Sequence, residues 1–183
     1  MGISFVRQGL KHLKEVGTIT RSSSFVSKMM VKKAQIKDAK FILELGAGDG
    51  AITQHILDAM QKDARLMIFE VNPEFCKQLR KIPDNRLIVV EDTAERLQEY
   101  MQQYQFPVAN SVVSAIPFVM LSDQECEKIL KKCQDVMHSG SYFVQIHYSL
   151  IKKKLYQKVF GEVKVKFQLL NLPPAFILCA QKS

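Results

Sequence analysis

The sequence has few of the features that mark disulfide-rich, zinc-binding or membrane-spanning chains. Only four of its 183 residues are cysteines, and none of them forms a C-x-x-C pair, so we expect neither a disulfide scaffold nor a zinc module. Its longest apolar run, at about 112–121, is interrupted by Pro117 and is far shorter than the roughly 20 residues that span a bilayer. The chain also shows no secretory leader, and we therefore expect a cytoplasmic protein.

The sequence also lacks repeats, low-complexity tracts and a Pro/Gly/Ser-rich linker. Its 47% hydrophobic and 24% charged residues are typical of a globular domain that buries a sizeable core. We therefore predict a single domain over residues 1–183, in which an N-terminal helical cap (1–40) precedes a sheet domain (41–183).

Acidic residues are in the minority. Asp and Glu together number 18, against 26 Lys and Arg, which gives a formal net charge of +8. A basic surplus of this size favours a polyanionic partner. It does not choose between a nucleic acid and an anionic lipid surface.

Short apolar segments alternate with helical patterns along most of the chain. We predict strands at 41–45, 66–69, 87–90, 111–114 and 142–148, and helices at about 51–60, 73–80, 93–104 and 122–137. This alternation implies βαβ units and a parallel sheet with helices on both faces. Two further strands, at 163–170 and 176–180, are joined by a short connection and should be antiparallel.

The first 40 residues lie outside this alternation. Their first apolar residues share one side of a helix: Ile3, Phe5, Val6, Leu10, Leu13 and Val16. The cations Arg7, Lys11 and Lys14 share the other side. A basic amphipathic helix fits a membrane surface, although a helix packed on the body of the protein would show a similar pattern. A second short helix is expected around 25–30.

A glycine-rich loop follows the first predicted strand, with the sequence Glu44-Leu45-Gly46-Ala47-Gly48-Asp49-Gly50. Glycines allow a tight turn and a close approach of a ligand to the backbone, which implies a nucleotide cofactor. The loop formally satisfies the dinucleotide pattern G-x-G-x-x-G/A. However, Glu44 and Asp49 would repel a pyrophosphate. They favour a cofactor with positive charge, such as the sulfonium and α-amino groups of S-adenosylmethionine.

Three further positions lie where the next predicted strands end. Glu70, followed by Val71, stands about 20 residues beyond the glycines, where a carboxylate can accept hydrogen bonds from ribose hydroxyls. Asp92, followed by Thr93, ends the third strand and is placed to accept from an adenine amino group. Ser114 ends the fourth strand. Because doubly wound sheets bind ligands at the carboxyl ends of their strands, these positions predict one cofactor site.

These residues and their spacing resemble the class I S-adenosylmethionine-dependent methyltransferases. Residues 115–118 (A-I-P-F) look like the N-[LI]-P-[YF] motif of rRNA adenine dimethylases. A closer likeness is to the bacterial phospholipid N-methyltransferases, which begin with an amphipathic segment. Four short motifs carry this likeness: G-T-I-T-R-S-S (17–23), V-V-S-A-I-P (112–117), F-V-Q-I-H-Y (143–148) and N-L-P-P-A (171–175).

The resemblance implies a Rossmann-like α/β fold with a seven-stranded, mostly parallel sheet, S-adenosylmethionine as cofactor and no metal. It implies methyl transfer to the amino headgroup of phosphatidylethanolamine and its methylated derivatives, at an anionic membrane surface bound by the N-terminal helix. Ser22 and Ser23 join the expected cofactor contacts. His147 and Tyr148 should point to opposite faces of their strand, and Tyr148, which matches the family tyrosine, is expected with Ser114 at the substrate amine.

Two other functions remain open. An RNA adenine methyltransferase would use the same cofactor site and the same basic charge, but Ser114 replaces the dimethylases' asparagine and their C-terminal helical domain is missing. A non-catalytic lipid- or protein-binding module with a degenerate cofactor pocket is less expected, because Glu44, Glu70 and Asp92 are intact. The lysine cluster at 152–166 would either bind lipid phosphates or form a solvated face.

Overall fold

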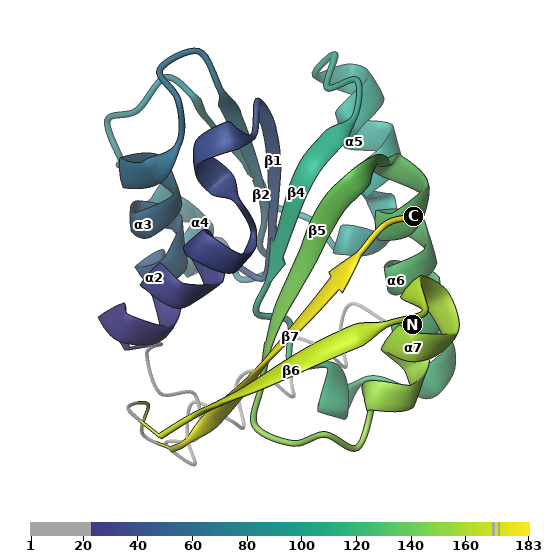
Figure 1. Cartoon of the computed structure of the whole chain (residues 1–183). Coiled ribbons are helices and arrows are strands. Elements are labelled where there is room, and N and C mark those ends of the chain that lie inside the picture. Colours follow the sequence, from purple (N-terminus) through teal and green to yellow (C-terminus); the bar gives the residue numbers. More distant parts are fainter. Residues whose placement is uncertain (1–22, 170, 172) are drawn as a thin grey trace.

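The protein is built on a single sheet of seven strands (Figure 1). A computed structural model describes residues 23–169, 171 and 173–183. The strand order is β3-β2-β1-β4-β5-β7-β6. The strands are β1 (Phe41–Leu45), β2 (Arg65–Phe69), β3 (Leu87–Val90), β4 (Ala109–Ser114), β5 (Met137–His147), β6 (Val163–Gln168) and β7 (Ala175–Gln181). Strands β1 to β5 pair in parallel, whereas β7 runs antiparallel to β5 and β6. The predicted mostly parallel sheet with an antiparallel end is confirmed.

Helices cover both faces of the sheet, as expected (Figure 1). One face carries α2 (Ser24–Lys33), α3 (Ala51–Ala59) and α4 (Pro73–Leu79), and the other carries α5 (Leu97–Gln103), α6 (Asp123–Val136) and α7 (Lys153–Phe160). Three short 3-10 helices complete the fold: η1 (Ile36–Asp38), η2 (Ala94–Arg96) and η3 (Phe118–Met120). Among the described residues, no helix combines the length and the hydrophobicity that a bilayer span needs.

Each layer of helices has its own apolar core, because successive side chains of a strand point to opposite faces. In β1, Leu43 and Leu45 pack towards α5, α6 and α7, whereas Ile42 packs towards α2 and α3. This alternation puts Glu44 on the face that α3 covers. The sheet therefore directs one carboxyl group of β1 into a largely apolar layer.

Helix α7 is absent from the predicted elements. The sequence at 152–158 stands out only as a group of lysines, whereas residues 153–160 form an eight-residue helix whose inner face buries Tyr156 and Phe160. Two buried aromatic residues four positions apart are a short signal. The surrounding lysines conceal it in the sequence.

The fifth strand is also longer at one end than predicted and shorter at the other. It begins at Met137, directly after α6, with three exposed residues at 138–140 whose polarity resembles that of a loop. It ends at His147, so Tyr148 follows the strand. The helix expected around 25–30 is confirmed as α2. The predicted amphipathic helix within 1–16, and Ser22, lie outside the described residues.

Candidate active site

The loop between β1 and α3 depends on glycine at three positions. Gly46, Gly48 and Gly50 have φ angles of +71°, +56° and +84°, in the left-handed region that other residues rarely adopt. A Cβ at Gly46 would lie 3.1 Å from the backbone nitrogen of Ile116, whereas a Cβ at Gly48 would meet no atom of the described residues within 4 Å. The backbone at Gly48 therefore borders open space that a ligand can occupy.

Glu70 connects this loop to the end of β2. One carboxylate oxygen accepts from the backbone N–H of Gly48 at 2.8 Å, and the other accepts from the N–H of Asn72 at 2.8 Å. Glu70 is buried and Val71 beside it is half-buried. Because a carboxylate has about four acceptor sites, these two bonds leave lone pairs for ribose hydroxyls next to Gly48. The structure thus brings Glu70 to the glycine loop, as the spacing predicts.

Glu44 contributes a buried carboxyl group to which no described residue donates a hydrogen bond. It is 1% exposed, and among the described residues neither oxygen has a hydrogen-bond partner. Burial raises the pKa of Glu44 to about 8, and the charge of Glu70 adds to this rise. The nearby Thr53 hydroxyl opposes the rise, although it lies outside hydrogen-bonding geometry. A neighbouring cationic N–H donor would stabilise the ionised form. The orphaned carboxyl, close to the open backbone of Gly48, fits the α-amino group of S-adenosylmethionine.

Asp92 is largely engaged with its own neighbours. One oxygen accepts from Arg96 at 2.7 Å and from the Tyr100 hydroxyl at 2.8 Å, and the other accepts from the N–H of Thr93 at 2.7 Å. Thr93 in turn caps η2 by accepting from Glu95 N–H. Asp92 and Thr93 therefore hold the η2–α5 segment. An adenine amino group would have to use the lone pair that these donors leave.

Ser23 also has a structural role. Its hydroxyl accepts from the N–H of Val26 and so caps α2, and its own N–H donates to the Asn171 side chain at 3.0 Å. These contacts join α2 to the segment between β6 and β7. Ser23 and Asn171, one residue from each of two motifs, therefore meet in space, and this contact is separate from any cofactor contact.

The loop after β4 is held by side chains from two neighbouring strands. The Ser114 hydroxyl accepts from the N–H of Ile116 at 3.4 Å, and the Gln145 amide donates to the carbonyl oxygen of Ile116 at 3.0 Å. Ser114 and Gln145 are both fully buried. Ser114 therefore supports this loop through its hydroxyl, and its contact with a substrate amine stays a prediction. Aligned position by position, the motif's asparagine falls on Ala115, so the expectation that Ser114 replaces it is wrong by one residue.

The end of β5 separates a buried histidine from an exposed tyrosine. His147 lies behind Phe118 and shares a 2.7 Å hydrogen bond with the Tyr156 hydroxyl, and burial lowers the pKa of His147 to about 4. Tyr148 is 43% exposed. Of the two, only Tyr148 is therefore open to a substrate, and their predicted placement on opposite faces of one strand does not apply because Tyr148 follows the end of β5. The contact of Tyr148 with a substrate stays a prediction.

Three residues near the site are absent from the site residues that the sequence predicts. Thr53, Gln145 and Tyr156 each contact or approach a functional group, yet each lies on a different element from its partner. For Gln145 a signal exists, since it is a polar residue in the apolar stretch of β5 and belongs to the F-V-Q-I-H-Y motif. Its role depends on the pairing of β4 with β5, which places Ser114 opposite Gln145.

Residues 20–170 match the family model of ribosomal RNA adenine dimethylase. The chain belongs to this family. It is accordingly an S-adenosylmethionine-dependent methyltransferase, which agrees with the open glycine loop and the orphaned Glu44 carboxyl. Family membership also favours an enzyme over the non-catalytic module considered above.

Relatives of this methyltransferase differ in how much of their length it matches. An ornithine lipid N-methyltransferase of Singulisphaera acidiphila is 30% identical over 93% of this chain and 91% of its own. The ribosomal RNA small subunit methyltransferase A of Thermotoga neapolitana is 25% identical over 61% of this chain but only 40% of its own. An O-methyltransferase of Bacillus cereus solved in complex with SAH has a TM-score of 0.71, 12% identity and coverage of 98% and 91%, which shows the shared fold.

Proposed function

We propose that this methyltransferase transfers a methyl group to the amine of a lipid headgroup, with phosphatidylethanolamine and its partly methylated derivatives as substrates. The observation that carries the proposal is the match with the ornithine lipid N-methyltransferase, which extends over 93% of this chain and 91% of that relative. The three Thermotoga rRNA methyltransferases are covered over only 38–45% of their length. Ornithine and ethanolamine headgroups share a primary amine, so both are tested below.

The cofactor side of the site uses the residues that carry open or unsatisfied polar groups. Glu70 would bind the ribose hydroxyls, Glu44 the α-amino group, and the backbone at Gly46, Ala47 and Gly48 would lie against the cofactor. When bound, S-adenosylmethionine supplies an electrophilic methyl group attached to a sulfonium. Transfer of this methyl group leaves the sulfur as a neutral thioether.

The substrate side has mainly to orient a neutral amine. A primary ammonium has a pKa near that of lysine, about 10.4, so it must lose a proton before it can act as a nucleophile. The apolar residues Ile116 and Pro117 after β4 favour the neutral form. Tyr148, exposed at the end of β5, would accept a hydrogen bond from the amine. His147 is buried and shares a hydrogen bond with the Tyr156 hydroxyl, so it holds that tyrosine and does not contact the amine.

Methylation of RNA adenine is a second candidate, because the family model that matches residues 20–170 is that of the ribosomal RNA adenine dimethylases. The net charge of +8 would suit RNA as well as lipid. The apolar Ala115 at the position of the motif's asparagine weighs against it, because no side-chain carbonyl remains there to accept from an adenine amine.

Incubation of the full chain with labelled S-adenosylmethionine tests the proposal. Separate reactions would contain vesicles with phosphatidylethanolamine, vesicles with an ornithine lipid, free phosphoethanolamine, and ribosomal RNA. We expect label in one or both lipids, and a rate about tenfold lower in Tyr148→Phe, as typical for losing one hydrogen bond made in the transition state. Label in RNA alone would contradict the proposal. Glu70→Ala serves as the inactive control.

A further inference from the structure

Exposed apolar side chains gather at one end of the molecule. The described residues include eight large exposed hydrophobic side chains: Phe25, Val119, Tyr104, Tyr148, Leu150, Ile151, Phe167 and Leu169. Five of them belong to two segments, the β5–α7 loop (Tyr148, Leu150, Ile151) and the end of β6 with the residue beyond it (Phe167, Leu169). We refer to these five as the apolar rim. Ile151 and Leu169 are the most exposed, at 78% and 73%.

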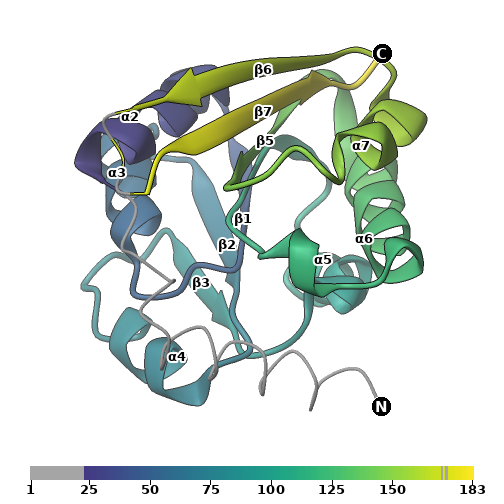
Figure 2. The ribbon, with the colours of Figure 1, turned by 90° about the horizontal axis from the view of Figure 1, so that it is seen from below.

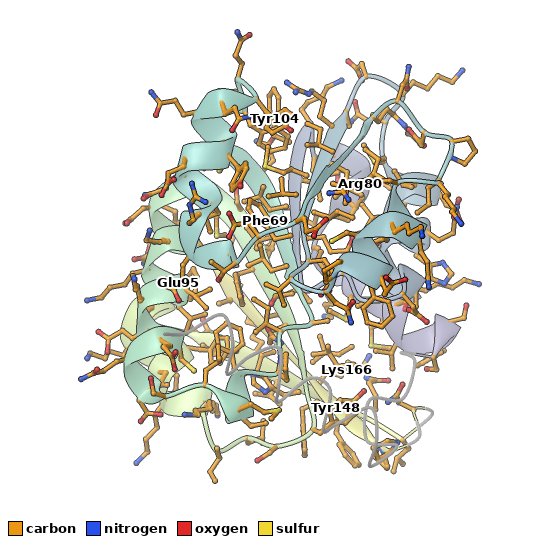
Figure 3. The ribbon with its side chains drawn as sticks, turned by 180° about the vertical axis from the view of Figure 1, so that it is seen from behind. Phe69, Arg80, Glu95, Tyr104, Tyr148 and Lys166 are labelled. Carbon is orange, nitrogen blue, oxygen red and sulfur yellow. The ribbon has the colours of Figure 1, made fainter. Side chains whose placement is uncertain are left out.

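Strand pairing brings both segments of the apolar rim to the same edge of the sheet, namely the one formed by the carboxyl ends of its parallel strands. His147 of β5 pairs with Phe176 of β7, and Phe176 pairs with Phe167 of β6. The carboxyl ends of β5 and β6 therefore lie at the same height in the sheet, on either side of β7. Figure 2 looks onto this edge, and in Figure 3 Tyr148 and Lys166 both lie at the lower end of the molecule while Tyr104 lies at the opposite end. This edge is also where β4 and β5 present the substrate side of the site.

Lysines without ion-pair partners accompany the apolar rim. Lys154 and Lys166 are exposed, and within the described part of the chain neither pairs with a carboxylate. Neighbouring lysines do have partners: Lys152 pairs with Asp123 and Lys158 pairs with Glu127. The rim therefore combines aliphatic side chains in water with uncompensated positive charge.

We propose that the apolar rim docks on an anionic phospholipid bilayer, with Ile151 and Leu169 entering the interface and Lys154 and Lys166 contacting lipid phosphates. The inference rests on the proposed lipid substrate. Aliphatic side chains gain free energy on leaving water for the boundary between headgroups and acyl chains, and lysines gain on approaching an anionic surface. A single-stranded nucleic acid would bind mainly by stacking its bases on aromatic rings, whereas three of the five rim side chains, including the two most exposed, are aliphatic and offer no such platform. Docking at this edge brings a headgroup amine to the site while its acyl chains stay in the bilayer.

Co-sedimentation of the full chain with vesicles of phosphatidylglycerol and phosphatidylethanolamine tests this surface. We expect the double variant I151E/L169E to lose about tenfold or more in vesicle partitioning. The double variant K154E/K166E should lose about fivefold per lysine, and less as salt is added. The controls Tyr104→Glu and Lys62→Glu change an exposed large hydrophobic side chain and an exposed lysine at the opposite, amino-terminal edge of the sheet. Each should bind vesicles within about twofold of the natural chain. Normal binding by both rim variants, or equal losses in the controls, would overturn the inference.

A water-soluble substrate separates this inference from the proposed function. The rim variants should methylate monomeric dihexanoyl phosphatidylethanolamine at about the natural rate while losing activity on vesicles, because they change access and leave the site intact. If the natural chain binds vesicles but methylates neither form of the lipid, the proposed function fails and the docking surface stands. If the rim variants instead lose binding to RNA and the natural chain ignores vesicles, the surface serves a nucleic acid and the inference is wrong.

Discussion

The side-chain amide of Gln145 donates a hydrogen bond to the carbonyl oxygen of Ile116 at 3.0 Å. The hydroxyl of Ser114, on the neighbouring strand, accepts from the N–H of the same residue. Ile116 in turn lies against Gly46, where an added Cβ would come within 3.1 Å of its backbone nitrogen. Two buried side chains therefore fix Ile116, which packs against the glycine loop after β1 and belongs to the loop after β4.

Gln145→Glu should separate catalysis from cofactor binding. A carboxylate cannot donate to Ile116, and loss of a buried hydrogen bond with its acceptor left unsatisfied costs about 1–3 kcal/mol. We expect kcat for lipid methylation to fall about tenfold or more, with a Kd for S-adenosylmethionine within about threefold of the natural value, because the cofactor contacts lie on β1 and β2. Steady-state kinetics and calorimetry measure the two quantities.

An exposed glutamine provides a control for the loss of such a hydrogen bond by itself. The Gln181 amide also donates to a backbone carbonyl, that of Gly140, at 2.8 Å, but at the other end of β5. Gln181→Glu should leave kcat unchanged. If Gln145→Glu affects kcat no more than Gln181→Glu does, the link through Ile116 has no catalytic importance.

Glu44 predicts a specific dependence of stability on pH in the protein without cofactor. Burial raises the pKa of Glu44 in the folded protein to about 8. Its carboxyl group therefore disfavours the folded state increasingly as the pH rises above 4.5, the ordinary pKa of this group. Each pH unit between about 4.5 and 8 should cost up to about 1.4 kcal/mol. Glu44→Gln removes this titration. The free energy of unfolding of the variant, relative to that of the natural chain, should therefore increase between pH 5 and pH 8. Urea unfolding of both proteins at these two pH values measures the difference.

The same substitution should weaken binding of S-adenosylmethionine about tenfold or more, because an amide provides no charge for the α-amino group. Binding to the natural chain at pH 7 should also release a proton, which calorimetry in buffers of different ionisation enthalpy detects. A stability difference that does not vary with pH, together with no proton release, would show that Glu44 is not the orphaned acid described above.

Gly48→Ala and Gly50→Ala should fail in different ways. Both positions require positive φ, so alanine costs about 1 kcal/mol at each. At Gly48 the methyl group would enter the open space beside the loop, whereas at Gly50 it would lie 3.0 Å from Leu79. We expect Gly48→Ala to lose mainly cofactor affinity and Gly50→Ala to lose mainly thermal stability. Equal losses of affinity in both would contradict the assignment of Gly48 to the cofactor surface.

The sequence predicts the part of the site that local pattern determines. The loop at 44–50 and the carboxylate of Glu70 follow from strand–glycine–helix spacing, because all lie at strand ends of one parallel sheet. The link from Gln145 to Ile116 does not follow, because it joins two strands whose register no local pattern reveals. Helix α7 is missed for another reason: its buried face consists of only Tyr156 and Phe160 within a run of lysines.

Identification of the methylated product in a mixed reaction tests the central claim most directly. The full chain would receive labelled S-adenosylmethionine together with ribosomal RNA and vesicles that contain phosphatidylethanolamine and an ornithine lipid, and mass spectrometry would identify each labelled product. The account predicts N-methylated amino lipid as the main product, with no product from Glu70→Ala. Methylated adenine in the RNA, with unmodified lipid in the same tube, would contradict it.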